Sequence, residues 1–366
     1  MKKVAVIGAG PSGITAIKNF NDQGFEVTAF ERCEGVGGNW RFNDPSGHSS
    51  VFETTHIISS KYTSFYEDFP LPKNASDYPS HKELLKYFND YANHFDINKF
   101  IKFGTEVLHC KYEDNHKWKI QWRSLNSEIT NEDEFDALVV CNGHHHEPRY
   151  PDYPGDFSGE YLHSHDYKSA KAFADKRVLV IGGGNSACDV AVETARVSKK
   201  TTISWRRGYH LIPKFMFGLT TDIFSYKSRW LPSKLRIPFM RFMLELIQGK
   251  NEDIGLPKVT NSILATHPTV NSELYDAIRH GKVKPKPDVE KIDGNTVHFT
   301  DQTHEDFDVI IACTGFRIKH KFFDKDLVDF ECGPVPLFHK MQEISIDLPI
   351  IFQILSLIGE LSLVES

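Results

Sequence analysis

The chain has 366 residues, a net charge of −6 at pH 7 and six cysteines. At about 150 residues per domain, this length favours two domains, and the slight acidity argues against nucleic-acid binding, which needs a basic face. The cysteines form no CxxC pair, so neither a zinc ribbon nor a redox dithiol is expected. Because Met1, Lys2 and Lys3 lead directly into an apolar run, we expect no signal peptide and a cytoplasmic location.

The first predicted elements are a strand at Lys3–Ile7, a glycine-rich GxGxxG turn and a helix that ends near Gln23. In a dinucleotide-binding turn, the first glycine permits the tight turn and the second lets the backbone approach a pyrophosphate. The third lets the helix pack closely on the strand, and the phosphate lies at the helix N-terminus. The candidate cofactor-binding residues of this turn are Gly8, Gly10, Pro11, Ser12 and Gly13.

A second strand is predicted at Glu26–Phe30 and is followed by Glu31, 23 residues after Gly8. An acid about 20 residues beyond the first glycine typically hydrogen-bonds a ribose hydroxyl. The strand, turn and helix order together with this acid makes the motif more specific than a lone GxGxxG.

The same pattern occurs a second time in the chain. A predicted strand at Arg177–Ile181 precedes a GxGxxA turn, in which Ala187 replaces the third glycine, and a helix to about Val197 and a strand at 201–204 follow. The candidate cofactor-binding residues of this turn are Gly182, Gly184, Asn185 and Ser186.

The two copies differ at the position of the acid. The residue 23 positions after Gly182 is Trp205, and Arg206 and Arg207 follow it. Guanidinium groups bind a ribose 2′-phosphate, which a carboxylate would repel. We therefore assign FAD to the first turn and NADPH to the second, and expect hydride transfer between them. The alternative is that Arg206 and Arg207 only end a strand on a solvated face.

Between the two turns, the chain resembles the flavin-containing monooxygenases. The fixed positions of that family's FxGxxxHxxx(Y/F)(K/P) fingerprint are matched by Phe157, Gly159, His163, Tyr167 and Lys168. Further segments resemble family motifs: the flavin-contacting GGxW at 37–40, the FAD-domain segments at 68–70 and 87–95, and ATG(Y/F) at 313–316. The resemblance adds Gly38, Asn39, Trp40 and Thr314 to the candidate cofactor-binding residues, and His48 follows the GGxW segment closely.

The resemblance implies an α/β fold with two Rossmann-like dinucleotide-binding domains. We expect an FAD domain at 1–168 plus 310–366 and an inserted NADPH domain at 169–309. Residues 213–257 then form a helical insertion in the NADPH domain.

The resemblance also implies the reaction of an N,N-dimethylaniline monooxygenase type of enzyme. NADPH reduces FAD, the reduced flavin captures O2 as a C4a-hydroperoxide, and this species oxygenates a soft nitrogen or sulfur atom of a small amine or sulfide. Three alternatives stay open: an NADPH oxidase that releases H2O2, a Baeyer–Villiger oxygenase, and an inactive truncated nucleotide-binding protein. The Baeyer–Villiger enzymes carry Trp-Pro where this chain has Tyr167 and Lys168, which favours the first family.

Few catalytic residues are expected, because the cofactors carry the chemistry. Many family members have an asparagine that hydrogen-bonds the flavin intermediate at the position of Ile58, which cannot donate such a bond, so Ser59 and Ser60 are the candidates to replace it. We interpret His163 as a hinge or relay residue rather than a base, with catalysis as the alternative. No metal site is expected, because the adjacent side chains of His144–His146 diverge from a loop.

Two segments have no motif to define them. Residues Pro213–Pro257 are rich in aromatic and basic side chains, with Pro232 and Pro238 expected to break them into short helices. We favour a lid with an aromatic core and a solvated basic face over contact with a membrane surface. The apolar run Leu348–Val364 is short for a membrane span, so we expect a buried strand and a shortened C-terminal region that lacks the family's closing helix. A homodimer is an open alternative to a monomer.

Overall fold

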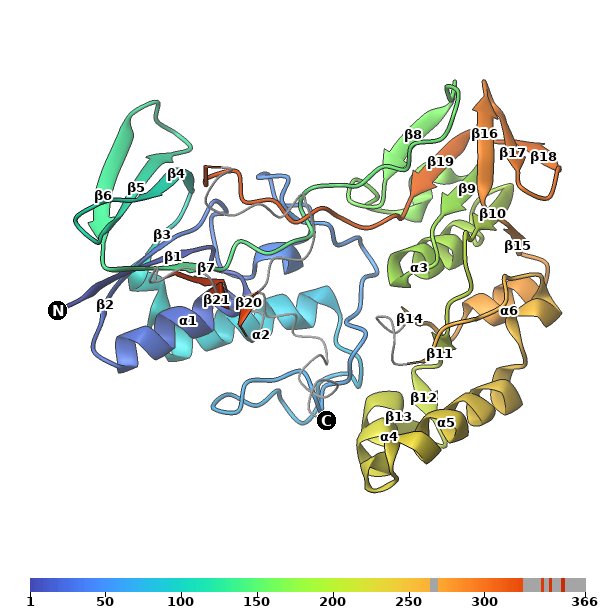
Figure 1. The fold of residues 1–366 in the computed structure, drawn as a ribbon, viewed down its shortest axis with the longest axis horizontal. Coiled ribbons are helices and arrows are strands. Elements are labelled where there is room, and N and C mark those ends of the chain that lie inside the picture. The colour runs from blue at the N-terminus through green and yellow to red at the C-terminus, as the bar shows by residue number, and fades with distance from the viewer. Residues whose placement is uncertain (264–268, 325–336, 339–341, 344–349, 353–366) are drawn as a thin grey trace. The chain divides into compact units, whose positions relative to one another are not determined.

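The computed structural model describes residues 1–263, 269–324, 337–338, 342–343 and 350–352. These residues form two compact units (Figure 1). The first contains Met1–His56, Phe65–Glu147 and the described residues from Phe316 onward, and the second contains Ile57–Ser64 and Pro148–Gly315. Within the described residues, the chain therefore passes between the units four times.

The first unit is built on a parallel five-stranded sheet in the order β22-β7-β1-β2-β3. Its strands are β1 (Lys3–Ile7), β2 (Glu26–Phe30), β3 (Ile101–Lys102), β7 (Ala137–Val140) and β22 (Ile350–Phe352). The helices of the unit are α1 (Pro11–Asp22), α2 (His81–His94), η1 (Gly38–Trp40) and η2 (Ile97–Phe100). Two antiparallel sheets complete it: β4 (Thr105–Tyr112), β5 (Trp118–Ser124) and β6 (Thr130–Phe135), and the pair β20 (Leu337–Phe338) and β21 (Gln342–Glu343).

The core of the first unit lies on both faces of its parallel sheet. Strand β1 is a continuous apolar run, as expected for a strand buried on both sides. On one face, Phe30 and Leu138 pack against Trp118, Ile120 and Phe135 of the β4-β5-β6 sheet. Helix α1 packs against β1 and β2 from the opposite side (Figure 1).

The second unit repeats this arrangement around a parallel sheet in the order β15-β10-β9-β19-β8. Its strands are β8 (Glu160–His163), β9 (Arg177–Ile181), β10 (Lys200–Ser204), β15 (Val283–Lys286) and β19 (Val309–Ala312). The helices beside it are η3 (Ala170–Phe173), α3 (Asn185–Thr194) and α6 (Leu274–Arg279), and the antiparallel sheet is β16 (Val289–Asp293), β17 (Thr296–Phe299) and β18 (His304–Asp306). Leu179 and Ile310 of the parallel sheet pack against Val297, Phe299 and Phe307, so the second core mirrors the first.

The predicted helical insertion follows strand β10. It contains the short pairs β11 (Leu211–Ile212) with β14 (Thr269–Val270) and β12 (Phe215–Met216) with β13 (Leu219–Thr220). Its helices are α4 (Thr221–Lys227), η4 (Ser228–Trp230), α5 (Ser233–Gln248) and η5 (Asn251–Ile254).

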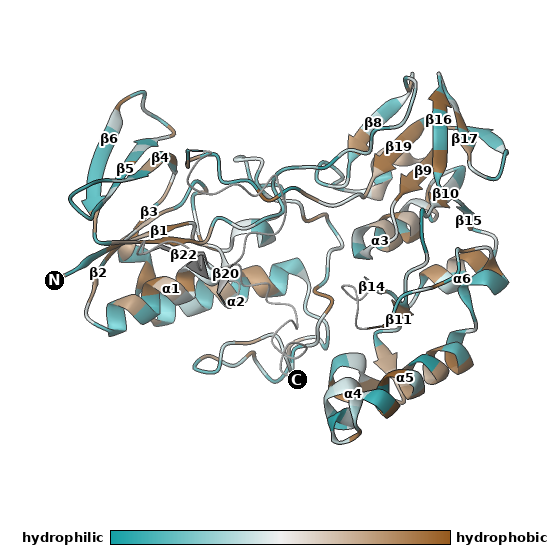
Figure 2. Ribbon diagram, in the orientation of Figure 1, coloured by the Kyte–Doolittle hydropathy of each residue, from teal (hydrophilic) through white to brown (hydrophobic). Residues whose placement is uncertain are grey.

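Two expectations for this insertion need correction. Pro238 does not break the chain into short helices but lies inside α5, and only Pro232 precedes a helix start. The helix continues because Met240 and Leu244, beyond the proline, pack on Ile212 and Met216. The second correction concerns the expected aromatic core: among the described residues of the insertion, the buried core cluster consists of Ile212, Met216, Met240, Leu244 and Ile263, and Phe224 packs against it only partly buried. Figure 2 shows that apolar and polar segments alternate along α5. The exposed fractions of Phe217, Phe242 and Trp230 are 67%, 59% and 81%.

The compact units also divide the chain at other residues than the motifs suggested. Strands β8 and β19 pair with each other, and β19 pairs with β9, so residues 160–163 and 309–312 belong to the second sheet. The expected boundaries at residues 168 and 310 fall inside this unit because they were drawn at motif ends, whereas long-range strand pairing sets the division.

The apolar C-terminal segment is described only at Ile350–Phe352. These residues form β22 and pair in parallel with β7, so a strand is present where one was expected. The remainder of the predicted segment lies outside the described residues. Among those that are described, no helix is long and apolar enough to cross a membrane.

Candidate dinucleotide sites

The first glycine-rich turn joins β1 to α1. The N–H of Gly8 donates to the carbonyl of Phe30 at 2.8 Å, and the N–H of Cys141 donates to the carbonyl of Ile7 at 2.8 Å. A Cβ at Gly8 would lie 2.5 Å from the carbonyl oxygen of Cys141, and the φ of +98° already favours glycine. A Cβ at Gly13 would lie 2.0 Å from the carbonyl oxygen of Gly8. Both glycines are therefore required by the fold itself.

This turn lies where the strand order of the first sheet reverses. Strands β2 and β3 follow β1 on one side, and the chain then crosses to β7 on the other side. In open α/β sheets, ligands bind at such a switch point, outside the carboxyl ends of the strands. The end of β1 next to the end of β7 is thus the expected nucleotide site of this unit.

The middle glycine of the turn, unlike the other two, is not required by the packing of the fold. Gly10 has an ordinary φ of −69°, and a Cβ there would have its nearest neighbour, the Cα of Gly38, at 3.7 Å. The packing of the chain alone would accept a side chain at this position. Without a side chain, the backbone at the N-terminus of α1 is accessible to a pyrophosphate.

Glu31 lies beside the same turn, at the end of β2. Its buried carboxylate accepts the N–H of Ala9 at 2.5 Å and the N–H of Cys33 at 2.8 Å. Burial raises the pKa of Glu31, against the opposing effect of these two backbone hydrogen bonds. Each oxygen accepts one bond from the backbone, and a carboxylate oxygen has capacity for a second donor such as a ribose hydroxyl.

The GGxW segment forms η1 directly against the turn. The N–H of Gly37 donates to the carbonyl of Ala9 at 3.0 Å. The side chain of Asn39 accepts from the N–H and the hydroxyl of Ser50, both at 2.8 Å, and so orders the loop that follows. His48 in this loop stacks on His146, with ring centroids 5.0 Å apart.

The second turn, between β9 and α3, repeats the hydrogen bonds of the first. The N–H of Gly182 donates to the carbonyl of Ser204 at 3.0 Å, and the N–H of Cys313 donates to the carbonyl of Ile181 at 2.8 Å. A Cβ at Gly182 would lie 2.3 Å from the carbonyl oxygen of Cys313. The turn again lies at a switch point, between β9 and β19.

The middle glycine of the second turn is also unexplained by packing. Gly184 has a φ of −84°, and a Cβ there would meet no atom of the described residues within 4 Å. The side chain of the next residue, Asn185, accepts the N–H of Val270 at 2.7 Å and ties the start of α3 to β14, whereas Ser186 is exposed. The space above Gly184 fits a second pyrophosphate in the same manner as Gly10.

The end of β10 differs from the end of β2. Trp205 is fully buried and packs edge-on against Tyr209 at 5.4 Å, while Arg206 and Arg207 are exposed. The guanidinium of Arg207 lies 5.2 Å from the centre of the Tyr209 ring. A Cβ at Gly183 would meet that ring at 2.2 Å, so Tyr209 covers this part of the turn. Where the first copy places an acid after its strand, the second thus places two solvent-accessible positive charges.

The fingerprint residues have structural partners in the second unit. His163 is fully buried in β8, where its Nδ1 accepts the N–H of His165 at 3.1 Å, and burial lowers its pKa to about 4. The hydroxyl of Tyr167 donates to Glu193 on α3 at 2.9 Å, and Lys168 donates to the carbonyl of His165 at 2.8 Å. The Tyr167 contact fastens the segment after β8 to α3, and burial leaves His163 uncharged near pH 7.

Segment Ile57–Ser64, which contains the candidates Ser59 and Ser60, belongs to the second unit. The hydroxyl of Ser59 bonds the hydroxyl of Ser64 at 2.7 Å, and that of Ser60 accepts the N–H of Tyr62 at 3.3 Å. Both serine hydroxyls therefore already have hydrogen-bond partners within their own segment. These bonds compete with the role of the family's asparagine.

Thr314 lies in the connection that leaves the second unit. Its hydroxyl donates to the carbonyl of Arg149, and the guanidinium of Arg149 donates back to the carbonyl of Thr314 at 3.0 Å. The main segment of the second unit begins at Pro148 and ends at Gly315. Arg149 and Thr314 therefore bond the chain where it enters this unit to the chain where it leaves. The observed contacts of Thr314 are therefore structural and hold these two chain segments together.

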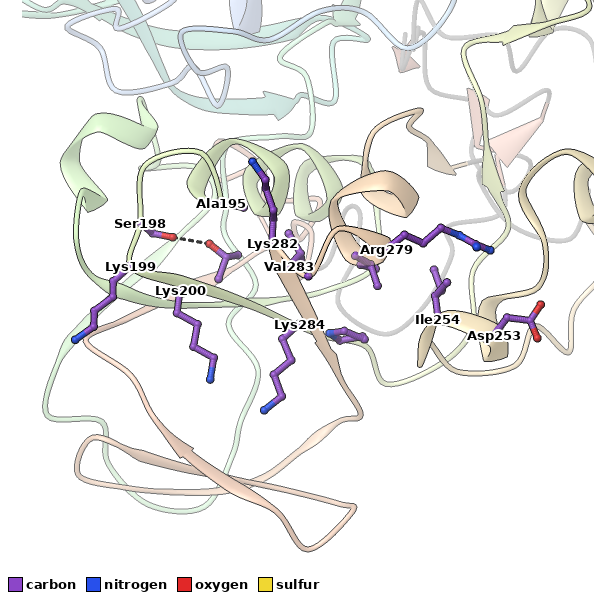
Figure 3. A pocket seen from close by; sticks show the side chains of 14 residues that line it. Ala195, Ser198, Lys199, Lys200, Asp253, Ile254, Arg279, Lys282, Val283 and Lys284 are labelled. Carbon is purple, nitrogen blue, oxygen red and sulfur yellow. Dashed lines mark hydrogen bonds between the residues drawn. The ribbon is translucent and has the colours of Figure 1, made fainter.

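A cavity of about 850 Å³ lies at the opposite edge of the second sheet, at the amino-terminal ends of β10 and β15 (Figure 3). Lys199, Lys200 and Lys284 extend from it to one side and Lys282 to the other. Lys200 and Lys284 both pair with Glu305. Because dinucleotides bind at the carboxyl ends of strands, this basic cavity is not the expected cofactor site.

Sequence patterns did not reveal three residues of the second unit that make contacts over long sequence distances. Tyr209 covers the second turn, Asn271 on the segment before α6 donates to Asp189 of α3 at 2.8 Å, and Asp222 of α4 accepts hydrogen bonds from segment Ile57–Ser64. Burial raises the pKa of Asp189 to about 7. No local pattern marks these residues, because their partners are far away in the sequence.

The fold and the two turns define a protein with two dinucleotide-binding units, and comparison with known proteins gives its family. The sequence model of the flavin-binding monooxygenase-like family matches residues 1–365. The chain therefore belongs to this family. Membership confirms the α/β fold with two Rossmann-like domains and the expectation of FAD and NADPH as cofactors.

Individual relatives agree with this assignment. Dimethylaniline monooxygenase (N-oxide-forming) 2 of Oryctolagus cuniculus is 35% identical over 355 residues, which cover 93% of this chain and 66% of that protein. The 4-hydroxybenzoate brominase (decarboxylating) of Marinomonas mediterranea is 33% identical over 342 residues, covering 88% of this chain and 64% of that protein. The chain thus spans slightly less than two thirds of these relatives. The solved S-allyl-L-cysteine S-oxygenase of Allium sativum shares the fold, with a TM-score of 0.69 and 22% identity over 96% of this chain and 71% of that one.

Proposed function

We propose that this protein is an NADPH-dependent flavoprotein monooxygenase that oxygenates soft nitrogen or sulfur atoms of small amines or sulfides. The observation that carries this proposal is the difference between two otherwise equal turns. One turn is flanked by the carboxylate of Glu31 and the other by Arg206 and Arg207. A single chain with one site of each kind is suited to hold FAD and NADPH together.

The residues of the first unit have defined tasks in this proposal. Gly10 leaves room for the FAD pyrophosphate at the start of α1, and Glu31 accepts a ribose hydroxyl while its bond to Ala9 fixes the turn. Asn39 orders the loop that bears His48, and a fixed loop next to the turn would help to exclude water from a bound flavin.

The residues of the second unit provide the preference for the phosphorylated nicotinamide cofactor. Gly184 leaves room for the pyrophosphate at the start of α3, and Arg206 and Arg207 bind the 2′-phosphate with charge-assisted hydrogen bonds. The ring of Tyr209 contacts the guanidinium of Arg207 and restricts its conformations before binding. Less conformational entropy is then lost when the phosphate binds.

The cofactors supply the chemistry when bound: a hydride passes from NADPH to FAD, and O2 is activated so that one oxygen atom reaches the substrate. The protein contributes orientation and exclusion of water rather than an acid/base triad. The fully buried His163 fits this division, since its lowered pKa leaves the imidazole uncharged near pH 7, with one ring nitrogen free of a proton.

The choice of amines and sulfides draws on the chain's relatives and on its fingerprint. The Oryctolagus cuniculus relative is named for N-oxide formation, and the Marinomonas mediterranea relative for bromination, so family membership alone does not set the product. Tyr167 and Lys168 end the fingerprint as in the flavin-containing monooxygenases and not as in the Baeyer–Villiger enzymes, which favours nitrogen and sulfur over ketones.

A second candidate function is NADPH oxidation with release of H2O2. Ile58 stands at the position of the family's asparagine and offers no hydrogen bond, and the hydroxyls of Ser59 and Ser60 have partners within their own segment. This combination favours release of the activated oxygen as H2O2 before it reaches a substrate.

One assay distinguishes the two functions. The purified protein is supplied with FAD, NADPH and O2, and NADPH consumption, H2O2 and N-oxide or S-oxide are measured with N,N-dimethylaniline and with a thioether. Product equal to most of the NADPH consumed would support the monooxygenase. H2O2 equal to the NADPH consumed, with either substrate, would replace it with the oxidase.

A further inference from the structure

A short segment of the N-terminal half is built into the second unit. Residues Ile57–Ser64, here called the strap, belong to that unit, although His56 before them and Phe65 after them belong to the first. The strap is well buried at Ile57, Ser60 and Ser64. The strap is therefore partly packed rather than a loose connection, although Tyr62 and Thr63 are exposed.

One carboxylate holds the strap in place. Oδ2 of Asp222, in the first turn of α4, accepts the N–H of Ser60 at 2.8 Å and the hydroxyl of Thr63 at 2.6 Å. Its other oxygen accepts the N–H of Ile223 at 2.9 Å. Within the strap, the N–H of Thr63 donates to the carbonyl of Ser60 at 3.1 Å and closes a turn around this contact.

The charge of Asp222 strengthens these bonds. Burial alone would raise its pKa, but the hydrogen bonds from Thr63 and Ser60 outweigh burial and hold the pKa below its usual value. The carboxylate is therefore ionised at neutral pH. Hydrogen bonds to an ionised acceptor are about twice as strong as those between neutral groups.

The chain is fixed again immediately after the strap. Tyr66 follows Thr63 by three residues, and its hydroxyl donates to the carbonyl of Pro11 at 2.8 Å. Its backbone N–H donates to the hydroxyl of Tyr87 at 2.8 Å. Pro11 is the first residue of α1, at the first glycine-rich turn. The anchor of the second unit at Thr63 and the anchor of the first unit at Tyr66 are thus only three positions apart in the sequence.

We propose that Asp222 is a positioning residue for hydride transfer: by anchoring the strap, it links the NADPH unit through residues 63–66 to the start of the FAD-site helix. This role rests on the proposed function. With the anchor, the strap adds the connections at 56/57 and 64/65 to those at 147/148 and 315/316. Without it, the strap loses its Ser60 and Thr63 hydrogen bonds to α4, and the loosened segment would hold the two reactants in a less defined orientation, on which the rate depends.

The proposed role predicts a separation of rate from affinity. In Asp222→Ala, the limiting rate constant of flavin reduction by NADPH under anaerobic conditions should fall about tenfold, since misorientation reduces the rate of a positioned reaction. The dissociation constants of FAD and NADPH should change by less than about twofold, because Asp222 belongs to neither candidate site and a factor of two is about 0.4 kcal/mol.

A physical readout tests the anchor without activity. Hydrogen exchange of the flavin-loaded protein should show faster exchange of the strap amides in Asp222→Ala, with Ser60 most affected because its N–H loses its acceptor. Thr63→Val removes only one of the two bonds at an exposed position and should give an intermediate effect. Asp276→Ala is the matched control, because Asp276 is an acid in the first turn of another helix of the same unit and is exposed.

The outcomes are distinct. Faster strap exchange together with slower reduction in Asp222→Ala, and neither in Asp276→Ala, would support the role. Unchanged strap exchange would overturn the anchor, and faster exchange with an unchanged reduction rate would overturn the positioning role. A wild-type flavin that NADPH fails to reduce would overturn the proposed function and this role with it, and it is recognised before any variant is compared.

Discussion

Glu31 and Trp205 occupy equivalent positions in two copies of one turn. The N–H of Glu31 donates to the carbonyl of Lys102 at 3.1 Å, and the N–H of Trp205 donates to the carbonyl of Lys286 at 3.0 Å. Equal backbone geometry thus carries different side chains: a carboxylate that bonds the first turn, and a buried indole followed by two exposed guanidinium groups. We expect this one position and the two residues after it to set the difference in nucleotide preference.

The first prediction concerns the 2′-phosphate. Replacing both Arg206 and Arg207 by Ala should weaken NADPH binding by on the order of tenfold for each guanidinium–phosphate hydrogen bond removed. NADH binding should stay nearly unchanged, because NADH lacks the phosphate. Titration calorimetry of the double variant with both nucleotides measures this, with Lys234→Ala as a control at an exposed cation on α5. Equal reductions in affinity for NADPH and NADH would contradict the assignment.

The glycines of the second turn give a contrasting pair of substitutions. Gly184→Ala should leave the melting temperature of the nucleotide-free protein nearly unchanged, because the new methyl group meets no atom of the described residues. It should still reduce NADPH affinity about tenfold or more, since the methyl occupies the pyrophosphate space. Gly182→Ala should instead destabilise the protein, because its Cβ would overlap the carbonyl of Cys313.

These two variants are separated by thermal unfolding and NADPH titration. If Gly184→Ala binds NADPH as the wild type does, the space above Gly184 is not a pyrophosphate site. If Gly182→Ala unfolds at the wild-type temperature, the close approach of the two strands is not required for stability.

Asp189 predicts a pH dependence of stability. Its folded pKa of about 7 lies above the ordinary value for aspartate, so the folded state binds this proton more tightly than the unfolded state. The stability that this group contributes is therefore present below about pH 4, the unfolded pKa, and is lost as the pH rises through about 7. Asp189→Asn keeps an oxygen for Asn271 and should raise the free energy of unfolding at pH 8 by a few kcal/mol at most, at about 1.4 kcal/mol per pKa unit.

Urea unfolding at about pH 5 and about pH 8 measures this effect, since the two values lie on either side of the folded pKa. The gain from Asp189→Asn should be larger at the higher pH than at the lower. An equal gain at both values would show that the carboxylate does not titrate in this range.

His163 predicts the absence of an effect. Because burial lowers its pKa to about 4, His163 is neutral in the folded protein throughout the range around neutral pH. The rate constant of flavin reduction in His163→Gln should keep the wild-type pH dependence over this range, even where its size changes. A titration step present in the wild type and missing in the variant would instead make His163 a proton carrier.

Local sequence patterns predicted both turns and the strands on either side of each turn helix. Strands Lys3–Ile7, Glu26–Phe30 and Arg177–Ile181 were predicted at their observed bounds, because continuous apolar runs followed by glycine-rich turns have few other structures available. The spacing to Glu31 and to Trp205 was also readable, since both follow a strand paired in parallel with the first.

Contacts between distant parts of the chain were not predictable in the same way. Asp222 bonds Ser60 across 162 residues, and β8 joins a sheet whose adjacent strand β19 lies far along the chain. Pro238 was expected to end a helix, but tertiary packing beyond it sustains α5. Local sequence propensity carries no information about contacts between distant residues. The unit boundaries and the strap could therefore be identified only in the structure.

The most direct test of the proposed function is the visible absorption spectrum of the purified protein with FAD, before and after NADPH is added without oxygen. We expect the absorption of a bound oxidised flavin and its bleaching by NADPH, because the proposal places one cofactor in each unit and a hydride transfer between them. A protein that takes up no FAD, or a bound flavin that NADPH does not bleach, would contradict the proposal.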